Sequence, residues 1–161
     1  MNAKIIGISR HRIGVDGPGV TTLVAFHGCT LSCKYCLNPK SIDPKVKGKR
    51  YTPSQLYDEI KKDNLYFLAT GGGVTFGGGE PLLQYKFIKE FRVLCGSDWK
   101  INIETALNVP LENVEEILPY IDNWIVDIKD IDNEIYHCYT GKDNDSTIQN
   151  LILLINRGAK N

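Results

Sequence analysis

The feature that most constrains this fold is an alternation of short apolar runs with segments of helical periodicity. Continuously apolar runs rich in β-branched residues are typical of strands that are buried on both faces. Four such runs predict strands at residues 21–26, 73–76, 100–103 and 124–128, and a further run predicts an edge strand at residues 4–9. The four main strands are therefore expected inside the molecule rather than along its surface.

Segments with apolar residues at helical spacing lie between the predicted strands. One helix is expected to begin at Thr52 and Pro53, because a capping residue followed by proline is typical of a helix start. The helices are marked by four groups: Leu56, Ile60 and Leu65; Phe87, Ile88, Phe91 and Leu94; Leu111, Val114, Ile117 and Leu118; and Ile148, Leu151, Ile152 and Ile155. Four βα units result, and they predict an α/β fold with a parallel sheet and helices outside it.

Composition and charge narrow the class of protein. The 161 residues suit one domain, 1–161, and 42% hydrophobic with 24% charged residues lie near the globular average. The 19 basic residues offset 19 acidic ones, so nothing favours a nucleic-acid or anionic-membrane partner. No run approaches the ~20 apolar residues of a membrane span, and the amino terminus lacks a long apolar stretch. We therefore expect a soluble cytoplasmic protein.

Three of the five cysteines form the most specific motif of the sequence. Cys29, Cys33 and Cys36 fall within eight positions directly after the first main strand. Three thiolates on a short loop can hold one inorganic centre, and a 4Fe-4S cluster, which normally takes four protein ligands, would keep one iron open for a small molecule. The alternatives are a structural zinc site made of three cysteines and His27, and reduced buried cysteines without metal.

Chemically active residues follow the other three main strands. They are Gly78, Gly79 and Glu80 after the second strand, Glu104 at the end of the third, and Asp127 and Lys129 at the end of the fourth. In parallel α/β folds the carboxyl ends of the strands share one rim, where ligands bind. The sequence therefore predicts that these residues and the three cysteines converge on one site.

The residues at the strand ends suit the binding of a zwitterion. Glycines let the backbone approach a ligand closely, and the Glu80 carboxylate could bind an amino group. Asp127 and Lys129 are two apart on the predicted strand, so both point to one face. The alternatives are tight turns for the glycines, a mutual ion pair for Asp127 and Lys129, and a solvated strand end for Glu104.

The remaining cysteines and histidines have no companion motif. Cys95 and Cys138 are expected to be packed free thiols, because cysteine serves readily as a small buried hydrophobe. His11 and His137 are expected to be surface or hydrogen-bonded histidines. Residues 38–53, with three prolines and five basic residues, are expected to form a connecting loop.

Several motifs along the chain carry a resemblance to a known family. They are Asp16-Gly17-Pro18-Gly19, the three clustered cysteines followed by Asn38, Gly71-Gly72-Gly73-Val74-Thr75 running to Gly78-Gly79-Glu80, Asp127-Ile128-Lys129, and Tyr139-Thr140-Gly141. Together they resemble the radical S-adenosylmethionine superfamily and, within it, the glycyl-radical-enzyme activating enzymes of the pyruvate formate-lyase activase type. The cysteine motif alone indicates only the superfamily. The Asp-Gly-Pro-Gly segment and the triple glycine indicate the activating enzymes.

The resemblance implies a partial (βα) barrel with a 4Fe-4S cluster and S-adenosylmethionine as cofactors. In such enzymes the open iron binds the amino and carboxylate groups of S-adenosylmethionine, and one electron cleaves it to a radical that takes hydrogen from a glycine of a partner enzyme. By position, the resemblance implies that the cluster is bound by Cys29, Cys33 and Cys36, and that Tyr35 lies on the adenine side. The amino group of S-adenosylmethionine is taken by Gly78, Gly79 and Glu80, and its methionine end is held by Asp127 and Lys129. Glu104 meets the ribose or a monovalent cation near Asp127.

The resemblance also implies two protein partners. One is a glycyl radical enzyme as the protein substrate, and the other is a flavodoxin- or ferredoxin-like electron donor. The alternatives are a radical S-adenosylmethionine reaction on a small molecule, a structural zinc module of three cysteines and a histidine, and an inactive fragment with an intact cluster loop.

Two departures from the family's pattern bear on these expectations. This chain has Glu104-Thr105-Ala106-Leu107 where the family often has an aspartate followed by Thr-Asn-Gly or Thr-Ser-Gly. Family members are also usually longer, with further strands after the fourth. We therefore expect a fragment whose fourth strand has an unpaired edge, which dimerises or aggregates through that edge and binds S-adenosylmethionine poorly. The alternative is a complete short activase, similar to those of the anaerobic ribonucleotide reductase type.

Overall fold

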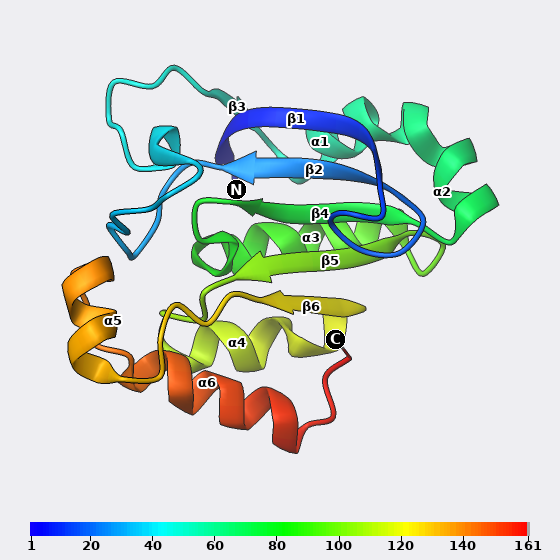
Figure 1. The fold of residues 1–161 in the computed structure, drawn as a ribbon. Coiled ribbons are helices and arrows are strands. Elements are labelled where there is room, and N and C mark those ends of the chain that lie inside the picture. Colours follow the sequence, from blue (N-terminus) through cyan, green and yellow to red (C-terminus); the bar gives the residue numbers. More distant parts are fainter. Residues whose placement is uncertain (161) are drawn as a thin grey trace.

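A computed structural model describes residues 1–160, and Figure 1 shows its ribbon. Asn161, the last residue of the predicted domain, lies outside the described residues. Six strands form one sheet in the order β3-β1-β2-β4-β5-β6, with bounds β1 (Ala3–Ile13), β2 (Val20–Phe26), β3 (Lys49–Tyr51), β4 (Gly73–Gly78), β5 (Lys100–Thr105) and β6 (Asn123–Val126). The pairs from β2 to β6 are parallel, whereas β1 is antiparallel to both of its neighbours. The predicted α/β fold with four parallel strands is confirmed, and the sheet is open rather than closed.

The helices follow the strands in the order that the sequence predicts. The α-helices are α1 (Pro53–Ile60), α2 (Asn64–Thr70), α3 (Tyr85–Cys95), α4 (Leu111–Ile117), α5 (Asn133–Thr140) and α6 (Asp145–Asn156), and the 3-10 helices are η1 (Pro39–Ser41), η2 (Lys61–Asp63), η3 (Pro81–Gln84) and η4 (Leu118–Tyr120). Each pair of neighbouring parallel strands is therefore connected through at least one helix, as right-handed βα units require.

The amino-terminal strand does not lie at the edge of the sheet. β1 extends to Ile13, past the expected end at Ser9, and β3 pairs with its outer side so that Ala3 lies opposite Tyr51. The prediction of an edge strand was wrong because β3 has only three residues and lies in a basic, proline-containing stretch without an apolar run. Such a short strand is specified by its pairing with β1 rather than by its own pattern.

The parallel pairs bring the carboxyl ends of the main strands to one edge of the sheet. Phe26, the last residue of β2, lies opposite Gly78, the last residue of β4. Thr105, the last residue of β5, lies opposite Val126, the last residue of β6. The arrowheads of these strands point to the same end of the molecule in Figure 1, so the loops that follow them meet there.

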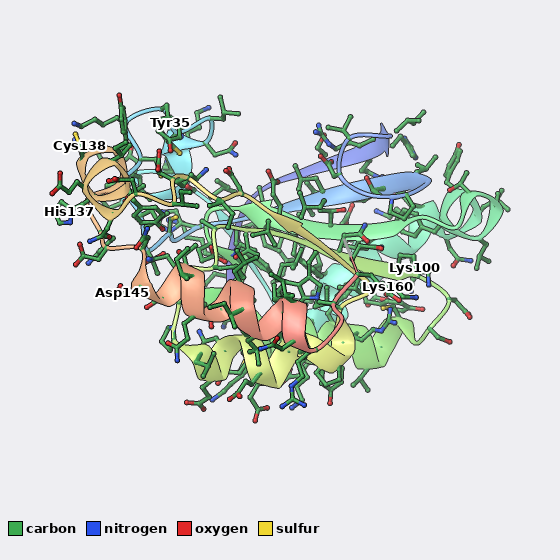
Figure 2. The ribbon with its side chains drawn as sticks, turned by 60° about the horizontal axis from the view of Figure 1, so that its bottom comes forward. Tyr35, Lys100, His137, Cys138, Asp145 and Lys160 are labelled. Atoms are coloured by element: carbon green, nitrogen blue, oxygen red, sulfur yellow. The ribbon has the colours of Figure 1, made fainter. Side chains whose placement is uncertain are left out.

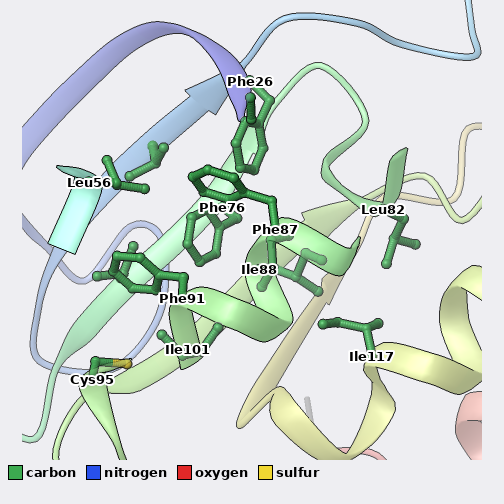
Figure 3. Close-up of a cluster of buried hydrophobic side chains, with 14 of the residues drawn as sticks. Phe26, Leu56, Phe76, Leu82, Phe87, Ile88, Phe91, Cys95, Ile101 and Ile117 are labelled. Atoms are coloured by element: carbon green, nitrogen blue, oxygen red, sulfur yellow. The ribbon is translucent and has the colours of Figure 1, made fainter. Parts of the chain in front are cut away.

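The hydrophobic core lies between one face of the sheet and the helices. Val74 and Phe76 of β4 and Ile101 and Ile103 of β5 are fully buried in it. Figure 3 shows this cluster, in which the ring of Phe76 stacks 5.4 Å from that of Phe26. A shift by one residue would turn these side chains to the opposite face of the sheet, so their burial fixes the register of the strands.

The opposite face of the sheet is covered near its middle by the loop of residues 14–19. Thr75 of β4 donates a hydrogen bond to the Asp16 carbonyl oxygen at 2.5 Å, and the Asn102 amide of β5 donates to the same oxygen at 3.3 Å. Gly17 lies so close to Asn102 that a Cβ there would collide with the amide. The Asp-Gly-Pro-Gly segment is therefore held against the sheet by side chains of two neighbouring strands.

Helix α1 has the predicted start but is shorter than expected. The Thr52 hydroxyl accepts a hydrogen bond from the Gln55 backbone N–H, and the Gln55 side chain accepts one from the Thr52 N–H, which forms a capping box. The helix ends at Ile60, and η2 separates it from α2, where Leu65 is 75% exposed. One continuous α-helix was therefore the wrong expectation, because residues 61–63 form a 3-10 helix in which Asp63 is buried.

The free edge of β6 is met by the chain that follows α6. The Trp124 N–H donates a hydrogen bond to the carbonyl oxygen of Lys160 at 2.9 Å. At Trp124 this edge is thus paired, in contrast to the unpaired edge that we expected.

In residues 1–160, none of the helices combines the length and the apolar character needed to cross a membrane.

Candidate cluster and cofactor site

A cavity of about 190 Å³ opens at the carboxyl ends of the parallel strands. All of the residues that the sequence analysis assigned to the site line it, namely Cys29, Cys33, Tyr35, Cys36, Gly78, Gly79, Glu80, Glu104, Asp127 and Lys129. Leu31, Leu37, Asn38, Ser41, Ile42, Thr105 and Ala106 complete the lining. Four loops that are far apart in the sequence therefore contribute to one concave site.

The three clustered cysteines are half-buried free thiols on the loop after β2. Burial raises the pKa of Cys29, and it also raises the pKa of Cys33 although the nearby Lys129 charge acts in the opposite direction. Thiols with raised pKa values stay protonated until a metal displaces the proton. The Thr30 hydroxyl in the same loop is buried and has no hydrogen-bond partner in residues 1–160, so it is available to donate to a bound sulfur.

The arrangement fits a cluster better than it fits a single zinc ion. Within residues 1–160, no three His, Cys, Asp or Glu side chains stand close enough together to hold one metal ion. His27, the fourth ligand of the alternative zinc site, does not line the cavity that the three cysteines share, and its Nε2 atom lies 3.0 Å from the Asp43 carbonyl oxygen. A cluster with several iron atoms binds each thiolate through a different iron and so tolerates a wider separation of ligands than one tetrahedral ion does.

The cysteine loop is anchored on α5, a helix that the sequence analysis did not predict. The backbone N–H groups of Ser32 and Lys34 donate to the carbonyl oxygens of Thr140 and Tyr139, each at 2.9 Å. Helix periodicity could not reveal α5, because it is short and largely exposed. Its signals in the sequence are Asp132, whose carboxylate caps its first turn, and the Tyr139-Thr140-Gly141 motif at its end.

Glycines give the second loop its close approach to the first. Gly78 has a φ of 91°, and a Cβ there would lie 2.7 Å from Ala25. A Cβ on Gly79 would collide with the Gly28 carbonyl oxygen, and a Cβ on Gly77 would lie 2.9 Å from the Glu104 carboxylate. Larger residues would push the loop after β4 away from the cysteine loop, so the glycines set the width of the cavity.

Glu80 is 1% exposed and is held by hydrogen bonds from three directions. Its carboxylate accepts from the Thr105 hydroxyl at 2.7 Å and from the backbone N–H groups of Leu82 and Ala106, each at 3.1 Å. Burial raises its pKa to about 7, because these neutral donors compensate only part of the lost hydration. A carboxylate has room for about four hydrogen bonds, so Glu80 can accept one more on the side of the cavity.

Glu104 is the more exposed of the two glutamates, and its surroundings are acidic. Its pKa is raised by partial burial and then by the negative charges of Asp16 and Asp127. A carboxylate in that setting favours a proton, a cation or a positively charged ligand beside it.

Asp127 and Lys129 follow β6 rather than lying on it. The strand ends at Val126, so their shared direction does not come from strand alternation, as we expected, but from the ion pair that they form with each other. Burial by itself lowers the pKa of Lys129, but the hydrogen bond and charge of Asp127 raise it above the usual value. The Lys129 ammonium also lies 5.7 Å from the ring of Tyr35, which links this loop to the cysteine loop.

The remaining cysteines and histidines lie outside the cavity lining. Cys95 is buried, as expected, whereas Cys138 is exposed and the expectation of a packed thiol was wrong. The reason is that α5 lies on the surface, where Figure 2 shows Cys138 and His137 near Tyr35. His11 and His137 are half-exposed and lie 3.1 and 3.0 Å from the carboxylates of Asp63 and Asp143, in agreement with the prediction.

Comparison with protein families defines the class of this protein. The profile of the Radical SAM superfamily matches residues 23–161, which is most of the chain. The chain therefore belongs to the radical SAM superfamily. Membership implies that the cofactors are a 4Fe-4S cluster and S-adenosylmethionine.

Within this superfamily, the chain is similar in sequence to several activating enzymes. The chain is 42% identical over 131 residues to the pyruvate formate-lyase-activating enzyme of Clostridium pasteurianum, which covers 80% of this chain and 53% of that protein. It is 41% identical over an alignment of 211 residues to the (2S)-3-sulfopropanediol dehydratase activating enzyme of Klebsiella oxytoca, with 93% and 66% covered. The pyruvate formate-lyase-activating enzyme of Staphylococcus epidermidis is 36% identical, with 81% and 55% covered. The chain thus spans between half and two thirds of the length of these relatives.

A solved structure supports the fold alone. The structure of QueE from Escherichia coli superimposes with a TM-score of 0.53, 13% sequence identity, and coverage of 99% of this chain and 92% of that one. The open, mostly parallel sheet of this chain is therefore the partial barrel that the sequence analysis predicted.

Proposed function

We propose that this chain is the cofactor-binding core of a radical SAM oxidoreductase that cleaves S-adenosylmethionine reductively and generates a glycyl radical on a partner enzyme. The observation that carries the proposal is the convergence of three thiols and the ends of four parallel strands on one cavity. The names of the relatives, which are activating enzymes for two different partners, support the partner class. We treat residues 1–161 as one radical SAM core domain.

The proposed roles follow from the position of each side chain in the cavity. Cys29, Cys33 and Cys36 would hold the cluster, which when bound supplies the electron that cleaves S-adenosylmethionine. Tyr35 would face the adenine of S-adenosylmethionine, and the loop of Gly78, Gly79 and Glu80 would take its amino group. Glu104 would meet the ribose or a monovalent cation shared with Asp127. Lys129 would bind the carboxylate of the methionine end. The raised pKa of Glu104 supports a positive charge at its side.

Glu80 and Lys129 would act through complementary means. Lys129 presents a compact positive charge that Asp127 keeps protonated, so it suits a carboxylate. Glu80 is fixed by three donors and needs no movement when the ligand arrives, so its remaining acceptor position is preorganised. We also propose that the enzyme works in the cytoplasm and takes its electron from a flavodoxin- or ferredoxin-like protein.

The test is anaerobic reconstitution with iron and sulfide, followed by reduction in the presence of S-adenosylmethionine. The expected result is about four irons per chain and release of 5′-deoxyadenosine and methionine. Electron paramagnetic resonance on a co-expressed glycyl radical enzyme should then show a glycyl radical only when S-adenosylmethionine and a reductant are present. A stoichiometry of one zinc per chain with no cleavage would overturn the proposal.

A further inference from the structure

Free positive charges are concentrated in one segment of this otherwise neutral chain. Residues 34–50 contain six basic side chains and a single carboxylate, that of Asp43. The basic residues are Lys34, Lys40, Lys45, Lys47, Lys49 and Arg50. We call this segment the basic loop.

The basic side chains of this loop are exposed, and none of them forms an ion pair with a residue in 1–160. Elsewhere most cations are neutralised, as in the pairs Lys61–Asp58 at 2.6 Å and Lys89–Glu116 at 2.9 Å. Outside the loop, the charge of Glu59 interacts with Lys49, but the ion pair of Glu59 is with Lys62. The loop therefore presents a net positive charge that is available to an external partner.

The basic loop has a fixed shape. The Gly28 N–H donates to the Ser41 carbonyl oxygen at 2.7 Å, and the Asp43 carboxylate accepts from the Lys45 N–H at 2.8 Å. At its far end the loop enters β3 and pairs with β1. A preorganised surface loses less conformational entropy on binding than a flexible tail with the same charge.

The same loop forms part of the wall of the cofactor cavity. Leu37, Asn38, Ser41 and Ile42 line the cavity, and Leu37 is 94% exposed at its mouth. In Figure 1 the segment between β2 and β3 lies at the end of the molecule to which the arrowheads of β2, β4 and β5 point. A molecule that docks on the basic loop is therefore held next to the three cysteines.

The chemistry of the loop favours an acidic protein over a nucleic acid. Single-stranded nucleic acids are bound by basic grooves that also offer aromatic side chains for stacking. The basic loop contains one aromatic residue, Tyr35, which lines the cofactor cavity and packs against Tyr139 rather than lying among the lysines of residues 40–50. Tyr51, which follows the loop, is buried, with the Lys49 ammonium 4.5 Å from its ring. Exposed lysines around an apolar tip such as Leu37 instead suit a transient, electrostatically steered contact between proteins.

We propose that the basic loop is the docking surface for an acidic one-electron carrier protein that reduces the bound cluster. The proposal rests on the proposed function, which requires one electron from outside for each cleavage of S-adenosylmethionine. In the step, the carrier loses one electron, the cluster gains it, and no proton or covalent bond is transferred. The oxidised carrier then leaves, which a salt-sensitive contact with few apolar side chains permits.

The test compares two triple charge reversals in the reconstituted holoenzyme. Lys40→Glu/Lys45→Glu/Lys47→Glu changes the basic loop but none of the residues assigned to the cofactors. Lys86→Glu/Arg157→Glu/Lys160→Glu makes the same change in net charge at exposed cations that have no ion pair in residues 1–160. Figure 2 shows Lys160 at the opposite end of the molecule from Tyr35.

Two readouts separate docking from cofactor chemistry. Stopped-flow absorbance gives the second-order rate of cluster reduction by a photoreduced bacterial flavodoxin, and calorimetry gives its affinity for the enzyme without S-adenosylmethionine. For the basic-loop variant we expect both to fall at least ~10-fold at low ionic strength and to approach wild type at high salt. The control variant should stay within about twofold of wild type, and dithionite should support equal cleavage by all three proteins.

Three outcomes would count against the proposal. Wild-type reduction by flavodoxin in the basic-loop variant would overturn it, as would an equal loss in the control variant. Binding of a single-stranded RNA that depends on the same lysines, without binding of flavodoxin, would replace it with a nucleic-acid site. Failure of dithionite to support cleavage by the wild type would instead refute the proposed function, so the two failures are distinguishable.

Discussion

The two ends of the sheet bury a carboxylate in opposite ways. Asp63 lies near the beginning of β2, is fully buried, and accepts hydrogen bonds from the Arg10 guanidinium at 2.9 Å and from the Thr22 hydroxyl at 2.9 Å. Glu80 lies at the carboxyl end of β4 and is buried to the same degree, but its three donors are one hydroxyl and two backbone N–H groups. One carboxylate is bonded to a cation and the other is not.

The difference appears in the pKa values. Burial alone would raise the pKa of Asp63, but the hydrogen bonds from Arg10 and Thr22 and the charge of Arg10 lower it below the usual value. Burial raises the pKa of Glu80 to about 7, since its neutral donors do not offset the desolvation. The buried carboxylate at the beginning of the sheet is therefore neutralised within the protein, whereas the one at the carboxyl end keeps polarity that a ligand can compensate.

Removing a thiol from the carboxyl end should abolish the chemistry while the fold persists. Replacing Cys29, Cys33 or Cys36 with alanine should each reduce the iron content from about four per chain to near zero and abolish cleavage of S-adenosylmethionine. Iron and sulfide assays, 5′-deoxyadenosine release and far-ultraviolet circular dichroism measure the three properties.

The matched control is Cys138→Ala, because this thiol lies at the same end of the molecule, 3.7 Å from the Lys34 ammonium, but outside the cavity. It should retain iron and cleavage. Full iron content in all three cavity variants would show that the cluster lies elsewhere.

Removing the charge of Asp63, at the beginning of the sheet, should lower stability but leave the chemistry intact. Asp63→Asn removes the charge from the buried acceptor of the Arg10 and Thr22 hydrogen bonds, so the free energy of unfolding at pH 7 should fall by ~2 kcal/mol. Cleavage per folded molecule should stay at the wild-type value. Urea unfolding followed by fluorescence measures the first quantity, and 5′-deoxyadenosine release under native conditions measures the second.

The contribution of Asp63 to the free energy of unfolding depends on pH. Because folding lowers the pKa of Asp63 below its usual 3.8, its contribution is fully present above that pH and is lost as the pH falls through the folded value. The stability difference between wild type and Asp63→Asn should therefore shrink in acid. Asp58→Asn, in an exposed pair with Lys61, is the control and should change stability little at any pH.

Lys129→Ala tests whether the charge at the carboxyl end serves a ligand or only Asp127. We expect the affinity for S-adenosylmethionine to fall about tenfold to hundredfold with the iron content unchanged, because a hydrogen bond to a charged group contributes ~1.5–3 kcal/mol. Lys100→Ala is the control, since Lys100 pairs with Asp122 at 3.3 Å at the opposite end, where Figure 2 places it. If calorimetry gave equal affinities for S-adenosylmethionine in the Lys129 variant and wild type, Lys129 would serve only as the ion-pair partner of Asp127.

The site could be predicted from the sequence because its residues follow strands. Once four apolar runs were placed in a parallel sheet, the positions of Glu80 and Glu104 after the second and third runs fixed the edge at which they meet. The detail was less predictable. Asp127 and Lys129 were expected to share a face through strand alternation, but the strand ends before them and an ion pair aligns them instead.

Features that depend on distant contacts could not be predicted. The carboxylate of Asp63 accepts hydrogen bonds from Arg10, which lies 53 positions away in the sequence, so no local sequence pattern predicts this pair. Strand β3 is specified by the edge of β1, and α5 is short and exposed, so neither has an apolar period of its own. Cys138 is exposed because α5 lies on the surface. The general preference of cysteine for burial gives no information on where that helix lies.

Glu80→Gln should have the smallest of the predicted effects, and it addresses the comparison most directly. The substitution keeps the shape but replaces one acceptor oxygen with an NH₂ group, which must face either the Ala106 N–H or the donors on the Thr105 and Leu82 side. At pH 4.5, where Glu80 is protonated in the folded protein, we expect a loss of ~1 kcal/mol in the free energy of unfolding. At pH 7 we expect a fall of about threefold to tenfold in affinity for S-adenosylmethionine. Glu90→Gln, at an exposed position of α3, is the control.

The pH profile distinguishes this glutamate from Asp63. Because folding raises the pKa of Glu80 from 4.5 to about 7, the folded protein holds the proton more tightly than the unfolded chain, so this group makes stability fall as pH rises between those values. The slope has the opposite sign to that of Asp63. Glu80→Gln should remove this decline, while Asp63→Asn should leave it in place. If urea unfolding between pH 4.5 and 7 showed the same decline in wild type and Glu80→Gln, the carboxylate at the carboxyl end would be as well compensated as Asp63, and the contrast between the two ends would fail.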